Sequence, residues 1–187
     1  INPIRGKVGQ ALITLMACVS VALWPRRRPV LEEDIRMDFA GKVALVTGAG
    51  SGLGRAASLA FAREGAALCL VGRSRAKLEE TGRLIRDAGG RCVELACDLG
   101  EPHGCREAIE GAMTAFGRLD VLCNIAADVM FHRLADIKEE EWNRTVASNL
   151  SGPFFLMQAA MPHLIESGGN IICVASTAGF MGQARGC

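Results

Sequence analysis

A glycine-rich turn carries the strongest chemical signal in the sequence. Residues 47–54 read Thr-Gly-Ala-Gly-Ser-Gly-Leu-Gly and follow directly on the apolar run Val43–Val46. Glycines allow a backbone to approach a ligand closely, and a turn leading from a strand into a helix directs N–H groups at a phosphate. The turn has neither the Gly-Lys-Ser/Thr ending of a P-loop nor the G-x-G-x-x-G spacing. It therefore predicts a pyrophosphate site built on a different spacing of glycines.

A basic residue stands just beyond a second apolar run, Leu68–Val71. In dinucleotide-binding folds an acidic residue at this strand end accepts hydrogen bonds from the ribose 2′-hydroxyl of NAD. Here Gly72 occupies that place and Arg73 follows it. A guanidinium suits a 2′-phosphate through charge-assisted hydrogen bonds. The sequence therefore favours NADP and leaves NAD open, although Arg73 could instead simply begin an exposed helix.

Composition excludes several other classes of protein. The chain has 187 residues, half of them hydrophobic, with 21 Lys and Arg against 20 Asp and Glu. This balance excludes a disordered chain and a polybasic nucleic-acid binder. The eight cysteines are scattered without a CxxC pair and the three histidines have no ligand spacing, so no metal site is predicted. Reduced thiols in a cytoplasmic protein are the favoured interpretation.

Alternating strand and helix patterns would position these residues. Short apolar runs are typical of buried parallel strands, and the amphipathic stretches between them are typical of covering helices. A long helix is expected over Glu139–Ile165, bent or interrupted at Gly152-Pro153. The pattern predicts an α/β fold, a doubly wound parallel sheet of the Rossmann-like kind. The expected strands are Val43–Val46, Leu68–Val71, Cys92–Ala96, Leu119–Cys123 and Asn170–Val174, and the other expected helices run from about Ala56 to Gly65, Arg75–Ala88 and Glu101–Phe116.

The first 36 residues do not share this pattern. Val8–Trp24 is an uncharged apolar run flanked by basic residues, at the short limit for a membrane span and without a good signal-peptide cleavage site. We favour translation from Met37, with 1–36 an extension outside the fold and 37–187 a dinucleotide-binding domain. With this start, membrane association is not expected. The alternative is that residues 8–24 form a hydrophobic anchor.

The glycine turn matches the pattern Thr-Gly-x-x-x-Gly-x-Gly, with Gly48, Gly52 and Gly54 in the glycine places. In this and four further motifs the chain resembles the short-chain dehydrogenase/reductase family, from about Gly41 to the C-terminus. The resemblance implies a nicotinamide dinucleotide as cofactor. The residues expected to contact this cofactor are Gly48, Ser51, Gly52, Leu53, Gly54, Arg73, Asp98, Leu99, Asn124 and Ala126.

Two of the supporting motifs lie after the third and fourth expected strands. Asp98 matches the family aspartate that contacts the adenine ring, although by itself it would be interpreted as a solvated loop residue or helix N-cap. Cys123–Ala127 falls where the family has Asn-Asn-Ala-Gly: Asn124 and Ala126 match, and the other two positions differ. The resemblance implies that Asn124 ties neighbouring strands together through its side chain.

The resemblance also implies two catalytic residues. Asn149 would bend the long helix and hold a water in a proton relay, although a lone helical asparagine is otherwise a surface residue or local break. Ser176, after the fifth strand, would hydrogen-bond the substrate oxygen; a serine there is otherwise a turn former. Family catalysis further needs a Tyr-x-x-x-Lys motif, in which the lysine lowers the tyrosine pKa. The sequence contains no tyrosine.

We therefore expect a fragment, incomplete at the C-terminal end of the sheet and inactive by itself. Its parent would interconvert an alcohol and a ketone by hydride transfer with NAD(P), act on a small molecule and form a homo-dimer or homo-tetramer. The alternative is a catalytically inactive module that binds a dinucleotide or a partner. A membrane-anchored reductase that uses Val8–Trp24 is a third interpretation.

Overall fold

The computed structural model describes residues 38–130 and 132–176. The description below concerns the unit that begins at Phe39. Val8–Trp24 and the expected start at Met37 lie outside the described residues.

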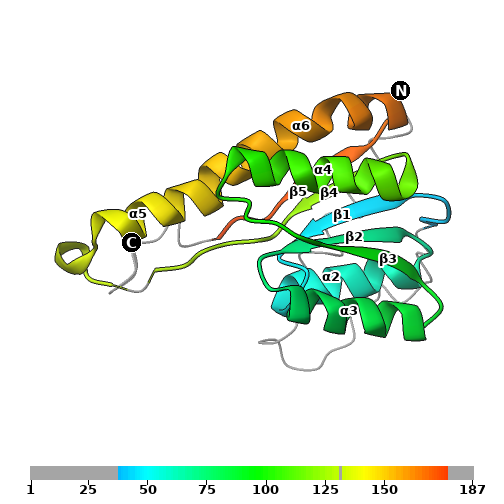
Figure 1. The fold of residues 1–187 in the computed structure, drawn as a ribbon, viewed down its shortest axis with the longest axis horizontal. Coiled ribbons are helices and arrows are strands. Elements are labelled where there is room, and N and C mark those ends of the chain that lie inside the picture. Colours follow the sequence, from blue (N-terminus) through cyan, green and yellow to red (C-terminus); the bar gives the residue numbers. More distant parts are fainter. Residues whose placement is uncertain (1–37, 131, 177–187) are drawn as a thin grey trace, which may run out of the picture. The chain divides into compact units, whose positions relative to one another are not determined.

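Strands and helices alternate along the described chain (Figure 1). The strands form a five-stranded sheet in the order β3-β2-β1-β4-β5, and every neighbouring pair is parallel. This confirms the doubly wound, Rossmann-like arrangement that the sequence predicts. The strands are β1 (Val43–Thr47), β2 (Ala67–Gly72), β3 (Arg91–Ala96), β4 (Val121–Asn124) and β5 (Asn170–Cys173), and the helices are α2 (Gly52–Arg63), α3 (Arg75–Asp87), α4 (Pro102–Phe116), α5 (Glu139–Val146) and α6 (Gly152–Ser167).

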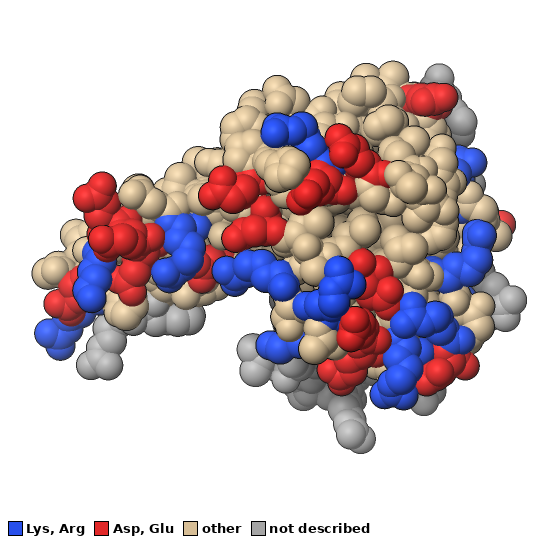
Figure 2. Space-filling model, viewed as in Figure 1, with Lys and Arg blue, Asp and Glu red and all other residues tan. Residues whose placement is uncertain are grey.

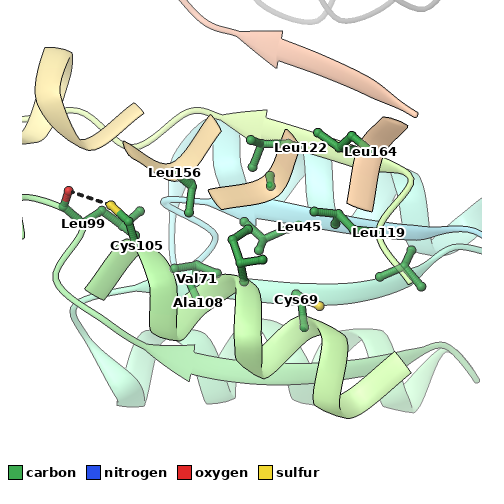
Figure 3. Close-up of a cluster of buried hydrophobic side chains, with 14 of the residues drawn as sticks. Leu45, Cys69, Val71, Leu99, Cys105, Ala108, Leu119, Leu122, Leu156 and Leu164 are labelled. Carbon is green, nitrogen blue, oxygen red and sulfur yellow. Dashed lines mark hydrogen bonds between the residues drawn. The ribbon is translucent and has the colours of Figure 1, made fainter. Parts of the chain in front are cut away.

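Helices cover both faces of the sheet, α4 and α6 on one and α2 and α3 on the other (Figure 1). Successive strand residues therefore pack into different cores: Leu45 lies in the cluster with α4 and α6, and Val46 in the cluster with α2 and α3. Figure 3 shows the first cluster, with Leu122, Leu156 and Leu164 among its members. Burial on both faces explains why β1, β2 and β4 read as continuous apolar runs.

The long helix is interrupted directly before Gly152-Pro153, next to the place that the sequence predicts. A π-helical turn spans Ala147–Ser151, and α6 begins at Gly152. Pro153 has no N–H, so the carbonyl of the residue four positions earlier has no α-helical partner, and the irregularity falls in the preceding turn. Gly152 packs tightly, because a Cβ there would lie 2.3 Å from the Leu99 carbonyl oxygen.

Charges of both signs are interspersed over the face seen in Figure 2. Among residues 38–130 and 132–176 the structure contains no helix long and apolar enough to cross a membrane. In the same described ranges no group of His, Cys, Asp and Glu side chains is arranged to hold a metal ion. The six cysteines that the structure describes are free thiols.

A buried carboxylate fixes the edge of the sheet where β1 begins. Asp120 is 4% exposed and accepts hydrogen bonds from the Val43 N–H (2.9 Å) and from Lys42 Nζ (3.1 Å). Arg118 adds two more through Nε (2.8 Å) and Nη2 (2.7 Å). Burial raises the pKa of Asp120, but these donors outweigh it and hold the pKa below its ordinary value.

We expect Asp120→Ala to lower the free energy of unfolding by about 2–3 kcal/mol, because it leaves the buried Val43 N–H without an acceptor. The partner cations are nearly half exposed and can be hydrated, so they add little to the loss. Asp87→Ala removes an exposed carboxylate paired with Arg83 and should cost under about 0.5 kcal/mol. Urea unfolding of the two variants measures the difference, and equal losses would contradict this role for Asp120.

Acidification provides a second measurement of the same carboxylate. Because the folded pKa of Asp120 lies below its unfolded value, its contribution is complete above the ordinary carboxyl range. It is lost as the pH falls through that range toward the lowered pKa. Asp120→Asn should therefore show a shallower loss of stability with acid than the unchanged chain does.

Candidate nucleotide-binding site

A cavity of about 440 Å³ lies at the carboxyl ends of the strands. Its lining comes from the glycine turn, the end of β2 and start of α3, the loops after β3 and β4, and Ser148 of the π-helical turn. Such a position, where strands of an open parallel sheet end, is where doubly wound folds bind ligands. The predicted cofactor residues that line it are Gly48, Ser51, Gly52, Leu53, Gly54, Arg73, Asp98, Leu99 and Ala126. Of the remaining predicted residues, Asn124, Asn149 and Ser176 are not part of this lining.

The geometry of the glycine turn requires its glycines. Gly48 and Gly52 have φ angles of +66° and +51°, a region that side chains disfavour. A Cβ on Gly54 would lie 2.2 Å from the Gly48 carbonyl oxygen, so only glycine lets α2 approach the turn this closely. Within the described residues the N–H groups of Ser51, Gly52 and Leu53 make no hydrogen bond. The turn thus presents a set of unpaired donors at a helix N-terminus, as a bound phosphate requires.

Thr47 connects this turn with the loop after β4. Its Oγ1 accepts hydrogen bonds from the Ile125 N–H (2.8 Å) and the Ala126 N–H (2.9 Å). Thr47 belongs to the glycine pattern, but its residue type and position in the sequence indicate no function of its own. Only the fold reveals one, because it brings residue 47 beside residues 125 and 126.

Two cations border the cavity near the connection between β2 and α3. Gly72 is the last residue of β2, as expected, and exposed Arg73 follows it. Lys77 also lines the cavity and was missed from the sequence. Arg73 precedes α3, which begins at Arg75, so no helical spacing in the sequence relates the two cations. With Arg73, Lys77 makes this end of the cavity positive.

Asp98 lies in the loop after β3, where its Oδ1 accepts a hydrogen bond from the Gly100 N–H (3.0 Å). Oδ2 makes no hydrogen bond with another described residue. The neighbouring Leu99 is buried, and its carbonyl accepts a hydrogen bond from Cys105 Sγ (3.4 Å; Figure 3). The loop is therefore fixed at Leu99 and presents the carboxylate of Asp98, the residue before it.

Asn124 and Asn149 connect neighbouring segments of the chain and do not line the cavity. Asn124 is 6% exposed, and its Nδ2 donates to Cys173 Sγ on β5 (3.6 Å). Asn149 lies in the π-helical turn and pairs with the backbone of Asp128: its Oδ1 accepts from the N–H and its Nδ2 donates to the carbonyl, both at 2.7 Å. Arg144 adds an ion pair to the Asp128 carboxylate (2.5 Å). The loop after β4 is thus fastened to the long helix.

Ser176 is exposed and follows β5 by three residues. Because β5 pairs in parallel with β4, this position lies beyond the same edge of the sheet as the glycine turn.

The core cysteines are unsuited to nucleophilic chemistry. Burial raises the pKa of the Cys69 and Cys123 thiols to about 12, and that of Cys105 to about 11. Thiolate is the reactive form, so these groups remain protonated and act as small core side chains.

A parallel sheet with a glycine turn and unpaired N–H donors at its carboxyl edge defines a nucleotide-binding protein of the doubly wound class. Residues 42–187 match the family described as short chain dehydrogenase. The chain belongs to the short-chain dehydrogenase/reductase family, as its resemblance implied.

Relatives of known sequence agree with this assignment. An uncharacterized oxidoreductase of Thermotoga maritima is 37% identical over 152 residues, covering 81% of this chain and 60% of the relative. Glucose and ribitol dehydrogenase homolog 2 of Arabidopsis thaliana is 36% identical, covering 77% and 52%. The chain therefore spans between half and about three fifths of the length of these curated relatives.

Solved structures agree on the fold and differ in cofactor. A metagenomic short-chain oxidoreductase in complex with NADP is 37% identical with a TM-score of 0.75, covering 79% of this chain and 67% of that one. An NAD+-bound xylitol dehydrogenase is 30% identical with the same TM-score, covering 80% and 58%.

Proposed function

We propose that this chain binds a nicotinamide dinucleotide, with preference for NADP, as part of an oxidoreductase that interconverts an alcohol and a ketone. The observation that carries the proposal is the cavity itself, where unpaired N–H groups of the glycine turn face a space bordered by Arg73 and Lys77. Similarity to an NADP-bound relative supports it.

Each part of the cavity suits one part of such a ligand. The N–H groups of residues 51–53 would hold the pyrophosphate, and Arg73 with Lys77 would neutralise a 2′-phosphate. The free oxygen of Asp98 would accept from the adenine amino group. A nicotinamide supplies the hydride acceptor or donor.

Ser176 and Asn149 are the catalytic residues that we propose from this chain. Ser176 would hydrogen-bond the substrate oxygen from beyond β5. Asn149, through its irregular turn, would keep the long helix and the Asp128 loop in the arrangement needed for a water relay.

Titration of the 187-residue chain with NADPH and with NADH by calorimetry tests the binding proposal. We expect both to bind, NADPH about tenfold more tightly, since one charge-assisted hydrogen bond is worth at least that factor. Absence of binding to either would refute the proposed function, and a preference for NADH would refute the assignment of the cations.

A non-catalytic binding module is the second candidate: these 187 residues contain no tyrosine, so by themselves they lack the acid–base group of the family. We expect the chain to bind the dinucleotide without oxidising any of a panel of primary and secondary alcohols, measured by nicotinamide absorbance. Turnover by this chain would exclude the module and would require a different acid–base group.

We also propose that the protein forms a homo-dimer or homo-tetramer through the long helix. Large apolar side chains are exposed along it, among them Leu150, Phe154, Met161 and Ile165. At 100° per residue the three on α6, Phe154, Met161 and Ile165, fall within one narrow stripe. Such a stripe is typical of a helix that packs against another copy.

Phe154→Glu combined with Ile165→Glu should weaken self-association by at least about tenfold, because each side chain would otherwise bury apolar area worth more than 1 kcal/mol. Sedimentation over a range of concentrations measures the effect. Glu166→Ala, an exposed change outside the stripe, should leave association unchanged. A monomer at all concentrations before mutation would contradict the proposal.

A further inference from the structure

Arg55 lies in the first turn of α2, directly after the last glycine of the turn. Its Nη2 donates to the Gly50 carbonyl (2.7 Å), and its Nε donates to Thr81 Oγ1 on α3 (3.0 Å). Its two terminal nitrogens also hold the Glu80 carboxylate at 3.0 and 2.7 Å. One side chain thus connects the turn, α2 and α3.

Thr81 extends this network to a second carbonyl of the turn. It is fully buried, and its Oγ1 lies 3.0 Å from the Ala49 carbonyl oxygen and 3.2 Å from that of Lys77. Because the hydroxyl has a single proton, it can accept from Arg55 and donate toward Ala49 at once. Two successive carbonyls, those of residues 49 and 50, are therefore held against α3.

The direction of these carbonyls decides what the turn can bind. A carbonyl oxygen turned into the cavity would repel a phosphate, whereas the N–H groups of the next residues attract it. The opposite side of the turn is fixed as well, because the Ala49 N–H donates to the Val71 carbonyl on β2 (3.2 Å). A Cβ on Gly50 would lie 2.8 Å from Lys77 Cβ, so the turn is already pressed against α3.

We infer that Arg55 is a positioning residue for phosphate binding: it turns the carbonyls of the glycine turn away from the cavity and so keeps its N–H groups available. The inference rests on the proposed nucleotide site. Arg55 is not part of the cavity lining, and its guanidinium is engaged by Gly50, Thr81 and Glu80. The hydrogen bond from Arg55 lowers the pKa of Glu80, so the pair remains charged at neutral pH.

A purely structural role, joining α2 to α3, would affect all ligands of the cavity alike. ADP and adenosine distinguish the two roles, because only ADP carries the phosphates that the turn would hold. The unchanged chain and Arg55→Ala are each titrated with ADP and with adenosine. In the variant we expect ADP affinity to fall about tenfold, the value of one charge-assisted hydrogen bond, because the turn is no longer held. Adenosine affinity should change by less than about twofold. Arg83→Ala, which removes an exposed arginine paired with Asp87 on α3, is the matched control and should change neither.

Milder variants keep the test decisive if Arg55→Ala does not fold. Arg55→Lys retains a cation able to reach one acceptor and should recover part of the ADP affinity. Glu80→Gln retains Arg55 and removes the charge that holds it, and should weaken ADP binding by about threefold. Equal ADP affinity in all variants, or a parallel loss of ADP and adenosine, would overturn the inference. Failure of the unchanged chain to bind ADP would instead overturn the proposed function.

Discussion

Gly54→Ala should reduce the affinity of the chain for NADPH by about a hundredfold, the loss of two charge-assisted hydrogen bonds. The added Cβ would lie 2.2 Å from the Gly48 carbonyl oxygen and 2.5 Å from its carbon. Both are backbone atoms, so the contact cannot be relieved by rotating a side chain. Either α2 or the turn must move, and the N–H groups of residues 51–53 then no longer converge on one phosphate.

The same substitution should lower the free energy of unfolding by about 1–3 kcal/mol, as overpacking in a well-packed region does. Calorimetric titration and urea unfolding measure the two effects separately.

Gly111→Ala is the matched control. A Cβ on Gly111 would meet only the side chain of Leu95, at Cδ2 (2.7 Å), Cδ1 (3.1 Å) and Cγ (3.5 Å), and the site lies within α4. The end of this side chain is flexible and can move aside. We expect unchanged NADPH affinity and an unchanged or slightly higher stability, since alanine favours a helix by up to about 1 kcal/mol over glycine. If both variants bound NADPH as the unchanged chain does, the close approach at Gly54 would have no part in binding.

The parts of the fold that follow from local patterns were predictable from the sequence. Buried parallel strands show as apolar runs, and α4 begins and ends where its signals stand: Glu101 is the N-cap, Pro102 is the first helical residue, and Gly117 ends the helix with φ of +69°. The cofactor residues that belong to contiguous motifs also lie around one cavity. Asn124 is the exception: it is the last residue of β4 and bonds to Cys173 instead of lining the cavity.

What the sequence did not reveal depends on contacts between distant segments. Thr47 acquires its partners only when β1 and β4 lie side by side, and Arg55 only when α3 packs on the turn. The π-helical turn before Gly152 is similar: its location depends on the tight packing of Gly152 against Leu99 as well as on Pro153. Periodicity records which face of an element is buried, and it carries no information on which polar atoms then meet.

The second large effect is expected at Arg73, one of the two cations that border the cavity after β2. Arg73→Glu should reverse the preference of the chain for NADPH over NADH. A carboxylate beside a 2′-phosphate adds repulsion to the lost charge-assisted hydrogen bond, so we expect NADPH affinity to fall by about a hundredfold. The same carboxylate can accept hydrogen bonds from the 2′-hydroxyl of NADH, whose affinity should hold or rise. Titration with both dinucleotides measures the ratio.

Arg75→Glu separates this direct contact from a general change of charge. It makes the same charge change two residues away, at the start of α3, at a position that is not part of the cavity lining. Long-range repulsion at physiological salt is screened over about 8 Å, so Arg75→Glu should weaken NADPH by no more than about threefold. Lys77→Ala should fall between the two variants, because it removes one of the two cations and adds no negative charge. Equal effects of Arg73→Glu and Arg75→Glu would mean that the 2′-phosphate senses only the overall potential, and the preference for NADP would then not reside in Arg73.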